Sequence, residues 1–194
     1  MIKILRSKRR TLSINIDVFG NVTVKAPLYV SDKKINEFIS SKKDWINKVL
    51  SKTDATNTEY CEIFNKSKGL IFGKIVDYTE DFIKTVKKLA NEYLPERIKH
   101  LSNMINMPYN SVKIKDYKSR WGSCDKNKNI SLNYKLVMID KILLDYVIIH
   151  ELCHTVYFNH KNEFHKLLKS FFKNEIDIRK RLNGYSFINK IDFK

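Results

Sequence analysis

The sequence predicts an α+β fold, and three patterns along its 194 residues support that class. Near the N-terminus, apolar residues alternate with polar ones, as in half-buried strands. Over residues 32–50 and 79–104, apolar residues recur at helical spacing. The densest apolar stretch is IDKILLDYVIIHELCHTVYF, whose length predicts a buried helix at about 139–157. Strands and helices thus occupy separate segments, which is typical of α+β proteins.

The first predicted element is a β-hairpin followed by a helix. Apolar side chains alternate on both sides of a Gly20-Asn21 turn, at Leu12, Ile14, Ile16 and Val18 and again at Val22 and Val24. Pro27 ends this pattern, and Ser31 can cap an amphipathic helix over about 32–50. We therefore expect a small β-rich lobe at the N-terminus.

The middle of the chain predicts a linker and then a second set of elements. Residues 51–68 are polar and weakly periodic, and GLIFGKIVDY after them predicts one or two short strands. The helix at 79–104 contains Pro95, which should kink it or begin a new helix. Alternation in SVKIKDY and NISLNYKLV predicts two adjacent strands joined by a long loop. We expect one domain, with an N-terminal lobe at about 1–78 and a core at about 79–194.

Composition excludes several classes of protein. The chain is 43% hydrophobic, which supports a packed core and excludes a disordered or low-complexity chain. No segment approaches the roughly 20 apolar residues that a membrane-spanning helix needs, so we expect no membrane partner. The charged first ten residues do not resemble a signal peptide, and Cys61, Cys124 and Cys153 are an odd number. These features predict a cytoplasmic protein with reduced thiols, and they favour no particular oligomeric state.

The net charge of +16, from 37 Lys+Arg and 21 Asp+Glu, makes nucleic acid a partner to consider. The excess lies at both ends, with 11 basic and 4 acidic residues in 1–50 and 9 and 4 in 161–194. Lysine-rich solvated helix faces explain the same numbers, and no recognisable nucleic-acid-binding motif is present.

Chemistry concentrates in one short segment that holds four of the five histidines. His150 and His154 frame an HExxH pattern on the predicted helix. Residues four apart on a helix differ by about 40° and 6 Å, so both imidazoles can bind one ion. Glu151 would then lie beside the ion, where it can accept a proton from a metal-bound water. The alternative is an ordinary helix with two histidines, but burying Glu151 without a metal or a partner would be costly.

A catalytic zinc site usually has a third protein ligand, and His160 is the best candidate. It follows His154 by six residues, so the helix must end or bend within residues 155–159, where Asn159 tolerates a left-handed conformation. Glu163 and His165 are the other candidates for this ligand. Three neutral imidazoles with an open position favour zinc over manganese, cobalt or nickel. A structural site using Cys124 and Cys153 fits less well, because Cys153 would crowd the water position.

Several motifs together resemble those of the YgjP-like family of predicted zinc-dependent hydrolases, over nearly the whole chain. They are RSKRR at 6–10, WI at 45–46, YLPER at 93–97, KSRWGSC at 118–124, ISLN at 130–133, VIIHELCH at 147–154, NH at 159–160, and Phe164. The sequence departs from the family at His165, where a Trp commonly follows the Phe, and residues 51–68 look divergent.

The resemblance implies a zincin-like α+β fold related to SprT-type and other compact metallopeptidases. In such a fold a small antiparallel or mixed sheet packs on the HExxH helix. One Zn²⁺ would be held by His150, His154 and His160, with Glu151 as catalytic acid/base. Zincins commonly bind peptide as an added strand, and by this analogy we expect the segment Ile130–Leu136 to be the edge that receives it.

The RWGSC loop allows two interpretations. Arg120 could stabilise an oxyanion or hold a substrate carboxylate, and Ser123 or Cys124 could line the cleft near the metal. Alternatively, Trp121 and Gly122 pack against the active-site helix, and Arg120 pairs with a carboxylate such as Asp116 or Asp145.

The sequence as a whole predicts a zinc-dependent metallohydrolase, and specifically a metallopeptidase acting on peptide or protein. One alternative is a nucleic-acid-associated metalloprotein, recruited by its basic surface and acting on a bound protein, as resemblance to SprT-type enzymes suggests. Another is a non-catalytic zinc scaffold. Glu151 argues against a scaffold, because a structural site has no use for a base beside its ligands.

Overall fold

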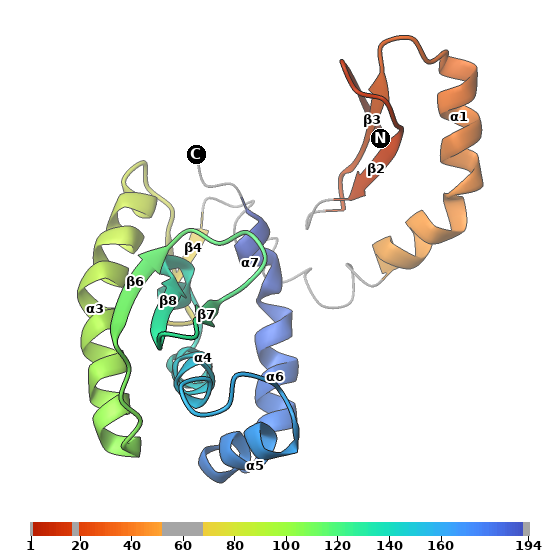
Figure 1. Ribbon diagram of the computed structural model, residues 1–194. Coiled ribbons are helices and arrows are strands. Elements are labelled where there is room, and N and C mark those ends of the chain that lie inside the picture. The colour runs from red at the N-terminus through yellow and green to blue at the C-terminus, as the bar shows by residue number, and fades with distance from the viewer. Residues whose placement is uncertain (1, 17–19, 52–67, 192–194) are drawn as a thin grey trace. The chain divides into compact units, whose positions relative to one another are not determined.

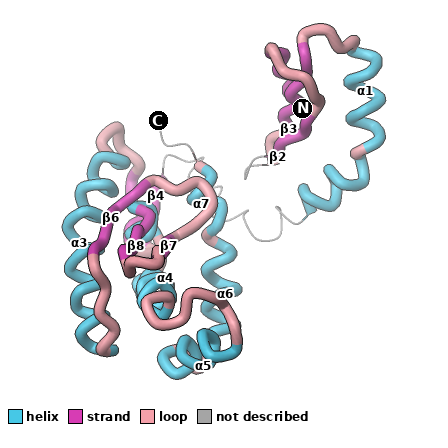
Figure 2. Tube along the Cα trace, in the orientation of Figure 1, coloured by secondary structure: helices cyan, strands magenta, loops and turns pink. Residues whose placement is uncertain are grey.

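The computed structural model describes residues 2–16, 20–51 and 68–191 (Figure 1). The chain divides into two compact units, Met1–Glu62 and Ile63–Lys194. Helices and strands occupy separate segments of the tube in Figure 2, and the predicted α+β class is confirmed. No helix among the described residues is both long and apolar enough to cross a membrane.

The first unit contains a three-stranded sheet and a helix. Strands β1 (Lys3–Ser7), β2 (Ser13–Ile16) and β3 (Val22–Pro27) lie in the order β1-β3-β2. The antiparallel β2–β3 pair confirms the predicted hairpin, although Val18 of that pattern lies outside the described residues. Strand β1 pairs with β3 in parallel and was not predicted, because its five residues are all exposed and show no alternation.

Helix α1 (Asp32–Ser41) begins where the sequence predicts, since the Ser31 hydroxyl accepts a hydrogen bond from the backbone N–H of Lys34. The single helix expected over 32–50 is wrong, because the backbone leaves the helical conformation at Lys42 and a second helical segment covers 43–51. The core of this unit is Val24, Ala26 and Ile35, with Leu12, Ile14, Val30 and Ile39 packed around it.

The second unit holds the remaining elements, which comprise a hairpin, a second three-stranded sheet and five helices besides a 3-10 turn. They are β4 (Lys68–Ile71), β5 (Lys74–Asp77), α3 (Phe82–Ile105), β6 (Ser111–Lys115), β7 (Gly122–Cys124), β8 (Asn129–Asn133), the 3-10 helix η1 (Tyr134–Met138), α4 (Lys141–Cys153), α5 (Asn162–Phe171), α6 (Glu175–Gly184) and α7 (Ser186–Lys190). Figure 1 shows α3 alongside β6 and α4 next to β7 and β8.

The hairpin β4–β5 confirms the short strands expected there, and its residues lie in the second compact unit. Its turn residues Phe72 and Gly73 have positive φ angles of 49° and 75°. Their N–H groups donate to the carbonyls of Val137 (2.7 Å) and Met138 (3.2 Å). These bonds hold the hairpin against η1. Pro95 lies inside the continuous helix α3 and does not begin a new helix.

The order of the second sheet is β6-β8-β7, with β8 parallel to β6 and antiparallel to β7. The strand predicted through residue 136 ends at Asn133, because Tyr134–Met138 turn into a 3-10 helix. The expectation that Ile130–Leu136 forms an edge is therefore wrong, since both sides of β8 are paired. Strand β7 lies at an edge instead.

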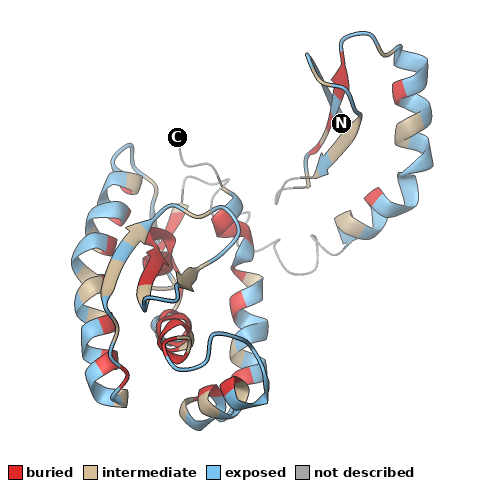
Figure 3. Ribbon diagram, in the orientation of Figure 1, coloured by how far each residue is buried: buried red, intermediate tan, exposed pale blue. Residues whose placement is uncertain are grey.

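The core of the second unit lies between β8 and α4, where buried residues gather in Figure 3. Ile130 and Leu132 of β8 and Leu144, Ile148 and Leu152 of α4 are fully buried. Burying such a side chain contributes about 1.5–3 kcal/mol relative to leaving it exposed. Because α4 has apolar residues on all sides, it is a central helix, as its sequence predicts.

One ion pair fixes α4 against α3. The Arg97 guanidinium donates to both Asp145 carboxylate oxygens, at 2.7 and 2.6 Å. The hydrogen bond with Asp145 is the main cause that raises the pKa of Arg97. Two parallel hydrogen bonds of this kind fix orientation as well as distance. The helix that carries the HExxH pattern is thus held in a fixed orientation against α3.

Candidate active site

Three histidine rings meet where α4 ends. His150 lies in the last turn of α4, and His154 caps its C-terminus. The chain then turns back over residues 155–160, so that Nε2 of His160 lies 3.1 Å from Nε2 of His150. One ring nitrogen from each of His150, His154 and His160 lies within 4.8 Å of the others. We call these three residues the histidine cluster.

The histidine cluster has the donor set that zinc prefers. Two nitrogens on one tetrahedral zinc ion lie about 3.3 Å apart, and the 3.1 Å between His150 and His160 is close to that value. In the part of the chain that the structure describes, this is the group of His, Cys, Asp and Glu side chains that could hold a metal ion. The residues present therefore fit a zinc ion.

The other candidate ligands lie outside the cluster. The His165 ring centre is 6.3 Å from that of His160, and Glu163 is an exposed residue in the first turn of α5. Cys124 and Cys153 are free thiols that do not join the group. The left-handed conformation expected at Asn159 is wrong. Its side chain instead accepts a hydrogen bond from the N–H of Lys161 (3.2 Å), which shapes the turn without a positive φ.

Phe164 forms the floor of the histidine cluster. It is fully buried, and its ring centre lies 4.5–4.9 Å from each of the three imidazole centres. It stacks on His154 and meets His150 and His160 edge-on. Such contacts restrict the rotation of the imidazoles, so Phe164 is a positioning residue for all three.

The surroundings of His150 and His160 favour their neutral forms, which are the forms that bind a metal. Burial, followed by the charges of His154, His160 and His165, lowers the pKa of His150 to about 3. Burial and the neighbouring histidines also lower the pKa of His160. The ring Nδ1 of His154 lies 2.9 Å from the carbonyl of Tyr157. Because a carbonyl only accepts, Nδ1 carries the proton and Nε2 keeps its lone pair.

Glu151 lies beside the cluster under strand β7. Its side chain is 6% exposed, and burial raises its pKa to about 8, although the charge of Arg120 lowers it. Gly122 passes directly over this carboxyl group. A Cβ atom on Gly122 would lie 2.8 Å from both Cγ and Oε1 of Glu151, closer than such atoms approach. Glycine, which has no Cβ, allows β7 to approach the carboxyl group this closely.

A network behind the sheet shapes the loop before β7. The fully buried Asn133 amide nitrogen lies 2.9 and 3.1 Å from the carbonyls of Tyr117 and Arg120, and 2.9 Å from Oδ1 of Asn189 in α7. The N–H of Asn133 also donates to the carbonyl of Trp121 (2.8 Å). Asn133 thereby fixes the backbone that presents Arg120 and Trp121.

The five residues of the RWGSC motif fall into two groups in the structure. Arg120, Trp121 and Gly122 line a cleft of about 270 Å³ together with His150 and Glu151. Ser123 and Cys124 are not among the lining residues; the Ser123 hydroxyl lies 3.1 Å from the Tyr117 hydroxyl. Burial and the charge of Glu151 raise the pKa of Cys124 to about 11, so this thiol is protonated at neutral pH.

The carboxylates expected to pair with Arg120 bind other cations. Asp145 is bound by Arg97, and Asp116 lies 3.4 Å from the Lys135 ammonium group. Arg120 instead stacks on the Tyr117 ring, with 5.5 Å between the guanidinium carbon and the ring centre. The remaining lining residues are Tyr146, Val147, Arg179 and Leu182. Arg179 and Leu182 belong to α6, and no sequence pattern marks them as neighbours of the motif. We call this site the arginine cleft.

Comparisons with known proteins place the chain in a family. A family model described as "YgjP-like, metallopeptidase domain" matches residues 10–79 and 76–185, which is most of the chain. The chain belongs to the YgjP-like family. The YgjP-like chain therefore contains a metallopeptidase-type domain, and the family expected from the motifs is confirmed. No curated protein matches it.

Two solved structures resemble part of the YgjP-like chain. The metallopeptidase zymogen of Methanocaldococcus jannaschii jannalysin has 29% sequence identity and a TM-score of 0.43, over 47% of this chain and 95% of its own. The metallopeptidase zymogen of Pyrococcus abyssi abylysin has 19% identity and a TM-score of 0.42, over 46% and 90%.

Proposed function

We propose that this YgjP-like protein is a zinc-dependent peptidase. In this proposal His150, His154 and His160 hold one Zn²⁺ and Glu151 is the catalytic acid/base. The observation that carries the proposal is the convergence of three imidazole nitrogens within 4.8 Å, next to the buried residue Glu151, which is 6% exposed. A purely structural site would gain nothing from that buried carboxyl group.

In the proposed hydrolysis, the bound metal and Glu151 would have separate roles. Bound zinc would supply a Lewis acid that polarises a carbonyl and lowers the pKa of a water molecule. Glu151 would accept a proton from the attacking water on its carboxylate and then deliver that proton to the leaving amine nitrogen. A carboxyl group whose pKa is raised by burial can both take up and release a proton near neutral pH.

Strand β7 supports a peptide as the substrate. Within the described residues it pairs with β8 on one side only, and Gly122 at its start lies against Glu151. An extended peptide that adds to the free edge of β7 would run past the histidine cluster with its backbone hydrogen-bonded to the strand.

The test compares Glu151→Gln with the wild-type protein, both loaded with zinc. We expect the variant to keep about one zinc per chain and to lose peptide hydrolysis by at least about 100-fold, since a general base contributes roughly 100- to 10,000-fold. Glu163→Gln, an exposed glutamate on the same segment, is the control and should keep full activity. Undiminished hydrolysis by Glu151→Gln would refute the catalytic role.

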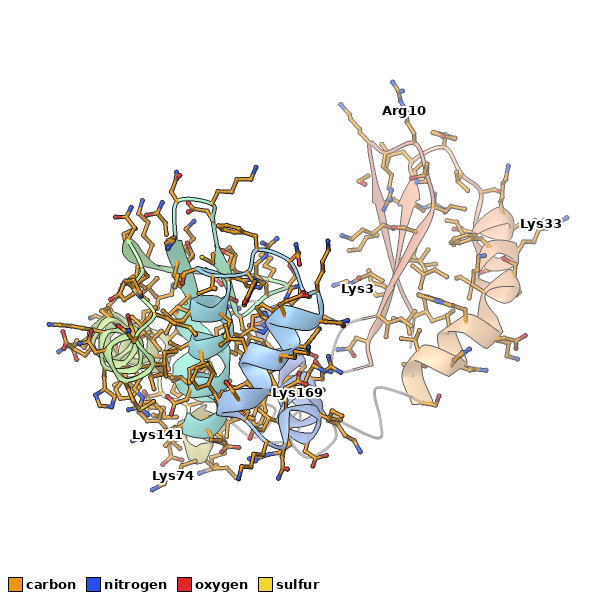
Figure 4. All side chains as sticks on the ribbon, turned by 60° about the horizontal axis from the view of Figure 1, so that its bottom comes forward. Lys3, Arg10, Lys33, Lys74, Lys141 and Lys169 are labelled. Carbon is orange, nitrogen blue, oxygen red and sulfur yellow. The ribbon has the colours of Figure 1, made fainter. Side chains whose placement is uncertain are left out.

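A second proposal is association with nucleic acid, which the net charge of +16 supports. Exposed basic side chains lie on several segments of both units, among them Lys3, Arg10, Lys33, Lys74, Lys141 and Lys169, which are labelled in Figure 4. A charge spread in this way favours binding that is independent of sequence. Duplex DNA binding should weaken steeply between 50 and 200 mM salt, by about 10-fold or more. A flat salt response would exclude this partner.

A further inference from the structure

The arginine cleft combines apolar walls with two guanidinium groups, directly beside the proposed catalytic carboxyl group. Its walls are formed by Trp121, Val147 and Leu182. Its volume of about 270 Å³ is below the range of about 300–1,000 Å³ that is usual for small-molecule sites. A cleft of this size suits one amino-acid side chain or chain end.

The positive charge of the cleft comes from two distant parts of the chain. Arg120 belongs to the loop before β7, and Arg179 lies in the middle of α6. Glu151 is the one acidic residue among those that line the cleft. Since Glu151 is assigned to proton transfer, the described lining contains no acidic side chain left to neutralise both arginines.

Among the described residues, neither guanidinium group has all of its hydrogen-bond donors occupied. Arg120 lies over the Tyr117 ring, while its two sequence-predicted acceptors are engaged elsewhere. Arg179 faces the buried Glu175 carboxylate at 3.9 Å, too far for a hydrogen bond. That carboxylate oxygen accepts instead from the Tyr146 hydroxyl at 3.1 Å. Glu175 thus holds the side chain of Arg179 near the cleft without occupying its donors.

We propose that the arginine cleft binds a carboxylate of the substrate next to the bond that is cleaved, through Arg120 and Arg179. This inference rests on the proposed peptidase function and names its substrate class, a peptide with an anionic group at this position. Planar guanidinium groups recognise carboxylates through paired hydrogen bonds, and an apolar wall strengthens such pairs by excluding water. The carboxylate belongs either to an Asp or Glu side chain or to the C-terminus of the peptide.

The experiment uses one internally quenched peptide sequence in matched forms. Glu or Gln is placed in turn at each position flanking the cleaved bond, and each peptide is made with a free and an amidated C-terminus. We expect one carboxylate position to raise kcat/KM by about 10- to 100-fold over its neutral counterpart, as for a charge-assisted hydrogen bond. A preference that survives amidation identifies a side chain, and one lost on amidation identifies the terminal carboxylate.

Variants then assign that preference to the two arginines. Arg120→Gln and Arg179→Gln should each lower the ratio of kcat/KM for the anionic peptide to kcat/KM for the neutral peptide by about 10-fold. The ratio is compared because the charge of Arg120 also lowers the pKa of Glu151, so its removal affects the turnover of both peptides. Arg181→Gln is the matched control. It lies on the same helix with the same 55% side-chain exposure, but it pairs with Asp140 and does not line the cleft. The proposal is overturned if wild type shows no carboxylate preference, or if the Arg120→Gln/Arg179→Gln double variant keeps it.

A binding measurement separates this proposal from the proposed function. The same peptides are titrated against zinc-loaded Glu151→Gln protein in which Trp45→Phe leaves Trp121 as the one tryptophan, and its fluorescence is followed. Tighter binding of the anionic peptide, without hydrolysis by wild type, would refute the peptidase function and support the cleft. Hydrolysis by wild type with equal binding of both peptides would refute the cleft alone.

Discussion

The histidine cluster and the arginine cleft share helix α4, but they are built in different ways. The three histidines of the cluster and Phe164 beneath them all come from one short segment, residues 150–164. The cleft is assembled from the loop before β7, from α4 and from α6, and the buried Asn133 and Glu175 hold its parts. The histidine cluster therefore depends on local structure, whereas the cleft depends on packing between distant segments. The two should respond differently to substitution.

The largest effect should come from removing a ligand of the cluster. His160→Ala should reduce zinc content from about one ion per chain to a small fraction, because ligand number sets the affinity. His165→Ala is the matched control, since that ring lies 6.3 Å from His160 and outside the cluster. Elemental analysis of both proteins, purified without added metal, measures this. If His160→Ala contained as much zinc per chain as wild type, the third ligand would be a different residue.

Phe164 tests whether the cluster depends on its aromatic floor. Phe164→Ala should lower the free energy of unfolding by about 3–5 kcal/mol, because it removes a fully buried ring. Phe164→Leu keeps most of the volume, and its cost should be about 1.5 kcal/mol or less. Urea denaturation gives the stability, and zinc titration gives the affinity. Unchanged zinc affinity in both variants would show that the imidazoles do not need the ring.

The pH dependence of the metal-free protein tests the burial of Glu151. Its pKa is raised from 4.5 to about 8 in the folded state, so the unfolded chain loses this proton first. The stability that the protonated carboxyl group contributes is complete below pH 4.5 and is lost as the pH rises to 8. The Gln side chain of Glu151→Gln cannot ionise. At a pH above 8, the free energy of unfolding of this variant should therefore exceed that of wild type by a few kcal/mol, at about 1.4 kcal/mol per pKa unit.

Urea denaturation with a chelator, at pH 5 and at pH 8.5, gives the difference in the free energy of unfolding between Glu151→Gln and wild type. We expect this difference to grow with pH. Glu163→Gln, with an exposed carboxyl group, serves as the control and should show the same difference at both pH values. A pH-independent difference for Glu151→Gln would mean that the carboxyl group is solvated.

The smallest of these effects is expected at Gly122, where the cluster and the cleft adjoin. Gly122→Ala places a methyl group 2.8 Å from Glu151 and should destabilise the protein by about 1–3 kcal/mol while displacing that carboxyl group. Gly184→Ala has no atom within 4 Å of the new methyl group and should be neutral. Denaturation and peptide hydrolysis are compared for the two variants. Full activity in Gly122→Ala would show that β7 can move away.

Features that depend on neighbouring residues could be predicted from the sequence. The hairpin β2–β3, the Ser31 cap and helix α4 follow from periodicity and capping chemistry. Histidines four residues apart on a helix also share a face without any knowledge of the fold, so the sequence could place His150 and His154 together.

Features that depend on distant pairing could not be predicted. Strand β1 pairs with residues about 20 positions away, and its exposed side chains show no alternation. The position of β8 between β6 and β7 requires knowing how the loop folds back. Arg179 joins Arg120 only because α6 packs against α4, and no spacing between the two arginines signals that contact.

Lys135 connects the active-site side of the sheet to the last helix. Its fully buried ammonium group donates to the carbonyls of Asn189 (3.2 Å) and Ile191 (3.1 Å), next to the bond between Asn133 and the Asn189 side chain. The amide nitrogen of Asn133 also bonds the carbonyl of Arg120, so the loop that carries Arg120 is connected to α7 through a single side chain. Local opening of α7 would therefore loosen the arginine cleft while the residues of the histidine cluster stay in place.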